Sequence, residues 1–150
     1  CPFSRQTLHD LKQQRAAIEA NGVELVIVHM IEDPDQAREF LARYELTDVT
    51  AISDPEQKLY RHFDIRQGSA NEYLGPQVWW KGLVCTVFEG HLPGKPQGDV
   101  TQLAGLILIR DDVVLREFRS QTSADRPDYV ALSRPLSEQE ASELANLLPE

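Results

Sequence analysis

Apolar residues recur along the chain at two spacings, and these spacings divide most of it into alternating helices and strands. Within residues 2–21 they follow the period of a helix, at Leu8, Leu11 and Ile18. Pro2 suits the first helical position, and Asn21-Gly22 ends the helix because glycine adopts the left-handed conformation without strain. The nearly continuous β-branched run from Val23 to Met30 then predicts a strand buried on both faces, as in a sheet covered by helices on each side.

The same helix-start signal occurs twice further along, as Asp33-Pro34-Asp35-Gln36 and Asp54-Pro55-Glu56-Gln57. In each copy an aspartate can cap the helix, proline can occupy the first turn and glutamine can reach back. A short strand over 49–52 separates the two helices. The apolar faces that these helices would bury consist of Ala37, Phe40, Leu41 and Tyr44 in the first and Leu59, Tyr60 and Phe63 in the second.

The second half of the chain is less regular until its end. In chain order it predicts a loop over 67–76, a helix over 78–88, a loop over 90–99, strands over 103–109 and 113–118 joined by a tight turn, and a last helix through Leu148 that opens with the capping box Ser137-Glu138-Gln139-Glu140. No internal repeat and no long linker interrupts this order. The sequence therefore predicts one α/β domain over residues 1–150, a sandwich with a mixed central sheet.

Composition narrows the classes of protein to which this chain can belong. Fifteen basic against 24 acidic residues give a formal net charge of −9, without a Lys/Arg cluster to neutralise phosphates, so we expect no nucleic-acid partner. No apolar run approaches the roughly 18 residues of a membrane span, and we expect no membrane partner. Two cysteines are too few for a disulfide framework, and no signal peptide is visible, which favours a cytoplasmic protein.

The first five residues, Cys1-Pro2-Phe3-Ser4-Arg5, carry the clearest chemical signal. A cysteine at a helix N-terminus meets unpaired backbone N–H groups and the positive end of the helix dipole. Both favour the thiolate and can lower a thiol pKa from about 8.5 toward roughly 3.5–7.5. The Ser4 hydroxyl, one turn along, can donate to the sulfur, and Arg5 adds a nearby cation. We therefore expect a catalytic site of Cys1, Ser4 and Arg5.

Two segments resemble a known family. The CxxS start Cys1-Pro2-Phe3-Ser4 looks like the redox motif of thioredoxin-fold proteins, and residues 98–109, beginning Gly98-Asp99, are similar to a "GD..QLGG" segment that leads into the closing hairpin. Together they resemble the peroxiredoxin-like branch of the AhpC/TSA (alkyl hydroperoxide reductase/thiol-specific antioxidant) superfamily, which includes relatives of selenoprotein L.

The resemblance implies a thioredoxin-like sandwich and a thiol-dependent oxidoreductase that reduces peroxides. In that fold a central strand directly precedes the redox helix, so we expect the first strand to be missing upstream of Cys1. The implied partners are a peroxide or small disulfide substrate and a thiol reductant of the glutathione or thioredoxin type. We expect no cofactor, and the assembly that we expect is a homodimer.

The chain departs from the family at Ser4, where many members have a second cysteine or selenocysteine. A disulfide within the motif cannot form, so an external thiol or Cys85 must resolve an oxidised Cys1. Two alternatives stay open: a glutathione-dependent monothiol reductase or transferase, and a redox-inert interaction domain anchored by Trp79-Trp80. The four histidines lack the spacing of metal ligands, and we expect no metal site.

Overall fold

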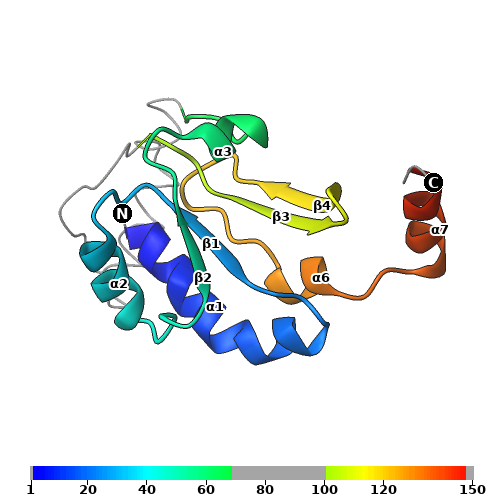
Figure 1. The fold of residues 1–150 in the computed structure, drawn as a ribbon, viewed down its shortest axis with the longest axis horizontal. Helices are drawn as coiled ribbons and strands as arrows, with labels where there is room; N and C mark the ends of the chain where they lie inside the picture. Colours follow the sequence, from blue (N-terminus) through cyan, green and yellow to red (C-terminus); the bar gives the residue numbers. More distant parts are fainter. Residues whose placement is uncertain (1, 69–100, 148–150) are drawn as a thin grey trace.

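A computed structural model of the chain contains alternating helices and strands, and it describes residues 2–68 and 101–147 (Figure 1). The segments predicted over 69–100, together with Cys1 and Leu148, lie outside the described residues. The elements in chain order are α1 (Pro2–Ala20), β1 (Val26–His29), α2 (Pro34–Ala42), β2 (Thr50–Ser53), α3 (Lys58–His62), β3 (Gly105–Arg110), β4 (Val113–Arg119), α6 (Tyr129–Ser133) and α7 (Glu138–Leu147).

The structure contains one parallel and one antiparallel strand pair among the described residues, the two kinds of pairing found in a mixed sheet. β1 pairs with β2 in parallel, in the register Val26 to Thr50. β3 and β4 form an antiparallel hairpin, and its turn residues Asp111 and Asp112 have φ values of 50° and 62°. Two left-handed residues between strands are typical of the turn that matches the strand twist, so the predicted tight turn is confirmed. Within the described residues these pairings form two separate two-stranded sheets.

Helix α1 provides one wall of the hydrophobic core. Its predicted face is confirmed, because Leu8, Leu11 and Ile18 are all buried. The other buried members of this core cluster come from the end of α2, the segment that follows it and α6, and they are Leu41, Leu46, Val49 and Tyr129. Ile27 of β1 and Leu106 of β3 pack against the same cluster, so both sheets contribute to one core. The helix ends at Ala20, and Gly22 has the expected positive φ of 78°.

Strand β1 is less covered than its sequence suggests. Val26 is 46% exposed, and the other three residues of the strand are half-buried. The prediction of a strand buried on both faces is therefore wrong. Among the described residues, β1 pairs with β2 along one edge and has no strand partner along the other.

The two helix-start signals behave differently. Asp33 caps α2 directly, its carboxylate accepting from the backbone N–H of Asp35 at 2.9 Å, and Pro34 is the first helical residue. After Asp54 the chain first makes a turn, in which the Gln57 N–H donates to the Asp54 carbonyl at 3.0 Å. Gln57 then has a left-handed φ of 57°, and α3 begins at Lys58. The predicted start at Pro55 is therefore three residues too early.

The C-terminal part of the chain contains one predicted helix and one that was missed. The capping box is confirmed: the Glu140 N–H donates to Ser137 Oγ at 3.2 Å, and the Ser137 N–H donates to the Glu140 carboxylate at 2.9 Å. Helix α6 was not predicted, since five residues are too few to show a helical period. Asp128 caps it by accepting from the Ala131 N–H at 2.9 Å.

Candidate functional site

The start of α1 is the candidate site that the sequence predicts. Helix α1 begins at Pro2, the residue that follows Cys1 in the sequence, and its first turn holds no acidic residue. Its first N–H groups therefore meet no carboxylate from their own turn, and these groups are the ones that stabilise an anion at a helix N-terminus. Of the predicted residues, Ser4 is exposed and Arg5 is half-buried, while Cys1 lies outside the described residues.

The charge of Arg5 acts on a tyrosine from the segment that follows α2. Burial raises the pKa of the Tyr44 hydroxyl, and the positive charges of Arg5 and Arg43 offset part of that effect. The Tyr44 ring is fixed by an edge-on contact with Phe40, at 5.7 Å between centroids. The guanidinium of Arg5 thus has a phenol within its electrostatic range at the same end of the helix, and nothing in the sequence pattern had connected these two residues.

Further along α1, a second set of contacts joins the helix to the chain that follows β4. The Asp10 carboxylate accepts from Arg126 Nη2 at 2.8 and 2.9 Å and from Nε at 3.2 Å. Near the other end of the helix, Asn21 Nδ2 donates to Ser133 Oγ at 3.0 Å. The segment from Arg126 to Ser133 therefore contacts α1 near its middle, at Asp10, and just beyond its C-terminal end, at Asn21. The sequence gives little sign of this contact, because Asp10 lies about 100° around the helix from its neighbour Leu11 and so falls outside the apolar stripe.

Gln102, three residues before β3, belongs to the family-like segment, and the sequence did not indicate its role. The Gln102 side-chain amide donates to the carbonyls of Ile65 at 2.9 Å, Arg66 at 3.1 Å and Leu103 at 3.3 Å. A backbone bridge joins Gln102 to Gln67. This glutamine ties the chain after α3 to the entry of the hairpin, and its role in the described part of the chain is structural.

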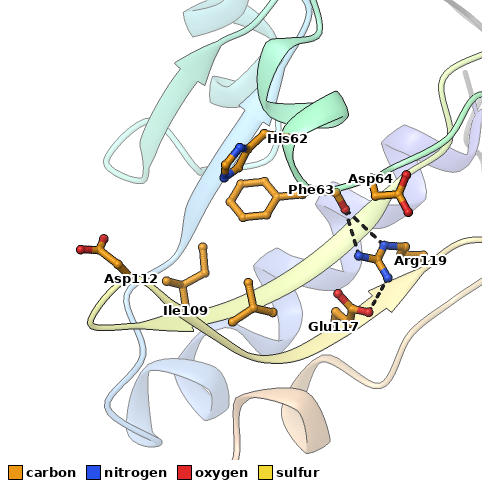
Figure 2. A pocket seen from close by; sticks show the side chains of 8 residues that line it. His62, Phe63, Asp64, Ile109, Asp112, Glu117 and Arg119 are labelled. Atoms are coloured by element: carbon orange, nitrogen blue, oxygen red, sulfur yellow. Dashed lines mark hydrogen bonds and ion pairs between the residues drawn. The ribbon is translucent and has the colours of Figure 1, made fainter. Parts of the chain in front are cut away.

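A hollow of about 360 Å³ lies between the end of α3 and the outer part of the β3–β4 hairpin (Figure 2). The residues lining it are His62, Phe63, Asp64, Ile109, Asp112, Val114, Glu117 and Arg119. Arg119 donates to the Phe63 carbonyl at 3.2 and 3.1 Å and pairs with Glu117, so its charge is already engaged. Neither Ser4 nor Arg5 lines this hollow, which is therefore distinct from the site predicted at α1.

The part of the chain that the structure describes contains no candidate metal site and no candidate membrane-spanning helix. Over residues 2–68 and 101–147, no three His, Cys, Asp or Glu residues gather as metal ligands. In the same residues no helix combines the length and apolarity needed to cross a membrane.

Burial lowers the pKa of His29 at the carboxyl end of β1, and its Nδ1 accepts from the Ile31 N–H at 3.2 Å. This histidine therefore has a structural hydrogen bond and favours its neutral form.

Comparison with known proteins finds a family whose model matches most of the chain. The sequence model of the AhpC/TSA antioxidant enzyme family matches residues 8–122, well over half of the chain. Among curated proteins and among solved structures, no match to the chain was found. The matched residues run from the middle of α1 to just beyond β4, and so include the parallel strand pair and the closing hairpin. From this match and its α/β architecture, the chain belongs to the AhpC/TSA antioxidant enzyme family and has a thioredoxin-like fold.

Proposed function

We propose that the protein is a peroxide-reducing thiol oxidoreductase in which Cys1 is the nucleophile. The observation that carries this proposal is helix α1, 19 residues long, which begins directly after Cys1 and has no acidic residue in its first turn. Unpaired N–H groups and the helix dipole at such a position favour a thiolate. Membership of a family of antioxidant enzymes supports the same chemistry.

In the proposed reaction the Cys1 thiolate attacks one oxygen of the peroxide in line with the O–O bond. The S–O bond forms as the O–O bond breaks, and the leaving oxygen departs as hydroxide or alkoxide and takes up a proton. Sulfur is oxidised to a sulfenic acid and the peroxide is reduced to water or an alcohol. We assign Ser4 a hydrogen bond to the sulfur and Arg5 the stabilisation of the departing oxygen.

A thiol must then return Cys1 to its reduced form. Because Ser4 occupies the fourth position of the motif, we propose that glutathione or a thioredoxin-type protein attacks the sulfenic acid and releases water. The mixed disulfide so formed is cleaved by a second thiol, which regenerates Cys1 and leaves an oxidised reductant. This cycle needs a reducing compartment, so we propose a cytoplasmic location.

Stopped-flow mixing of the reduced protein with hydrogen peroxide tests the proposal. We expect rapid peroxide consumption by the wild type and by Cys85→Ser, and its loss in Cys1→Ser. Equal consumption by Cys1→Ser overturns the proposal.

Incubation with glutathione disulfide tests the alternative of a monothiol reductase. A stable glutathione adduct on Cys1 without peroxide turnover favours that alternative. An alkylation pKa of Cys1 near the free value of about 8.5 instead favours a redox-inert domain.

A further inference from the structure

We propose that the ion pair between Asp10 of α1 and Arg126 is a positioning element for Cys1, holding the N-terminal half of the helix in the orientation that the thiol chemistry requires. The proposal rests on the function proposed above. It assigns no contact between either side chain and the substrate.

The pair has the geometry of a structural anchor. Both carboxylate oxygens of Asp10 accept from Arg126, at distances between 2.8 and 3.2 Å, so the guanidinium is held in one orientation. The Asp10 side chain is 9% exposed and that of Arg126 is 52% exposed. A carboxylate this deeply buried depends on its partner, because without it the negative charge would be left uncompensated.

Tyr129 joins the same group of side chains. It is buried in the core, and this burial is the main cause that raises the pKa of its hydroxyl. A hydrogen bond with Thr7 and the charge of Arg126 lower that pKa, whereas the charge of Asp10 raises it. The side chains of Thr7 and Asp10, one turn apart on α1, thus both act on residues 126–129. This segment is therefore joined to the N-terminal half of α1 by a core ring as well as by the ion pair.

Such an anchor matters because helix ends fray. The first turn of a helix has N–H groups without intrahelical partners, and its order depends on tertiary contacts. If the N-terminal half of α1 moves, the N–H groups of its first turn lose their fixed orientation, and the stabilisation proposed for the Cys1 thiolate is weakened. Residues 126–129 lie beyond the segment 8–122 that matches the family model.

A direct effect of these charges on Cys1 would be small. Asp10 lies eight residues along α1 from Pro2, which is about 12 Å at 1.5 Å per residue. Its charge is paired with that of Arg126 at 2.8 Å, so the two opposite charges largely cancel at that distance. Among residues 2–68 and 101–147, the titratable groups on or near this half of the helix are Arg5, His9 and Asp10 on α1, Tyr44 after α2, and Arg126 and Tyr129 from the segment after β4.

A positioning role and a direct effect of charge predict shifts of opposite sign in the Cys1 pKa for one variant, Asp10→Asn. Removing a negative charge in Asp10→Asn would by itself stabilise a thiolate and lower the Cys1 pKa, whereas Arg126→Ala would raise it. If the pair acts by positioning, both substitutions raise the pKa, because both loosen the helix. The two mechanisms are therefore distinguished by Asp10→Asn.

The experiment measures iodoacetamide alkylation against pH in the full chain, with peptide mass spectrometry to separate Cys1 from Cys85. Helix-terminus effects of about 0.3–1 kcal/mol correspond to a pKa rise of about 0.2–0.7 in both variants. At a pH below the thiol pKa this slows alkylation by roughly 1.6- to 5-fold, and Arg126→Lys restores most of the rate.

The matched control is Ser133→Ala, which removes the bond between Asn21 and Ser133 at the far end of the same helix. We expect it to leave the Cys1 pKa unchanged. A lower or unaltered pKa in Asp10→Asn, or an equal rise in Ser133→Ala, overturns the positioning role. If the wild-type Cys1 pKa is itself near 8.5, the proposed function fails first, and that result is distinct from either outcome.

Discussion

The carboxylates of Asp33 and Asp54 each accept from N–H groups at the start of a helix. Comparing them tests how much burial changes the contribution of such a cap to the free energy of unfolding. Asp54 is buried, at 6% exposure, and its carboxylate accepts from the N–H groups of Lys58 and Leu59, each at 2.8 Å. Asp33 is exposed and accepts from the Asp35 N–H at 2.9 Å. The perturbation is the same truncation to alanine at each position.

The expected loss of stability for Asp54→Ala follows from those two bonds. Hydrogen bonds to a charged group contribute about 1.5–3 kcal/mol each, while the loss of a helix cap costs up to about 2 kcal/mol. Because the Lys58 N–H can regain water more readily than that of half-buried Leu59, we expect a net loss of about 2–4 kcal/mol. Asp33→Ala leaves its N–H groups open to water, so its loss is expected to be well below that of Asp54→Ala.

Urea unfolding followed by far-UV circular dichroism measures both losses. With a slope of about 2 kcal/mol per molar urea, Asp54→Ala should lower the midpoint by roughly 1–2 M. Asp54→Asn, which keeps one acceptor oxygen, should fall between the wild type and Asp54→Ala. A loss in Asp33→Ala that equals the loss in Asp54→Ala would refute the reasoning, because burial would then have no effect on the cap.

Two further predictions concern packing and pH. A Cβ at Gly105 would lie 2.7 Å from Cδ1 of Ile65, the far end of a side chain that can rotate away, so Gly105→Ala should cost about 0.5–1.5 kcal/mol of unfolding free energy. Ile65→Val, which removes that methyl group, should recover part of this cost in a double-mutant cycle. The ion pair with Arg116 lowers the pKa of Glu140 from 4.5 to about 2, so its contribution to stability is complete above pH 4.5 and is lost as the pH falls toward 2. The difference in urea midpoint between wild type and Glu140→Gln should therefore be larger at pH 6 than at pH 3, and an equal difference at both values would contradict this assignment.

Local signals were sufficient wherever a residue's partner lies within a few positions of it. The sequence predicted the first helix, over 2–21 against the observed 2–20, as well as the cap at Asp33, the turn at Asp111-Asp112 and the capping box from Ser137. Each of these depends on spacing or on a side chain reaching nearby backbone. The family resemblance was also carried by short motifs and was confirmed by the match over 8–122. The assignment of Cys1 as the nucleophile stays a prediction.

Features that depend on distant partners were not predicted. Arg116 of β4 is an example: its side chain is 9% exposed and donates to the carbonyls of Leu132 and Arg134 as well as to Glu140. Nothing near Arg116 in the sequence indicates these acceptors. The exposure of Val26 has the same origin, since a β-branched strand has the same sequence whether or not a neighbour covers it.

The sequence by itself determined the order and kind of most elements, the buried face of α1 and the cysteine placed immediately before that helix. The tertiary structure alone decided that α3 starts after a left-handed residue, that Arg5 lies in range of Tyr44, and that Asp10 is buried against Arg126. The physical reason is range. Periodicity and capping act over one or two turns of chain, whereas the burial and pairing of a charge depend on which distant segment folding brings to it.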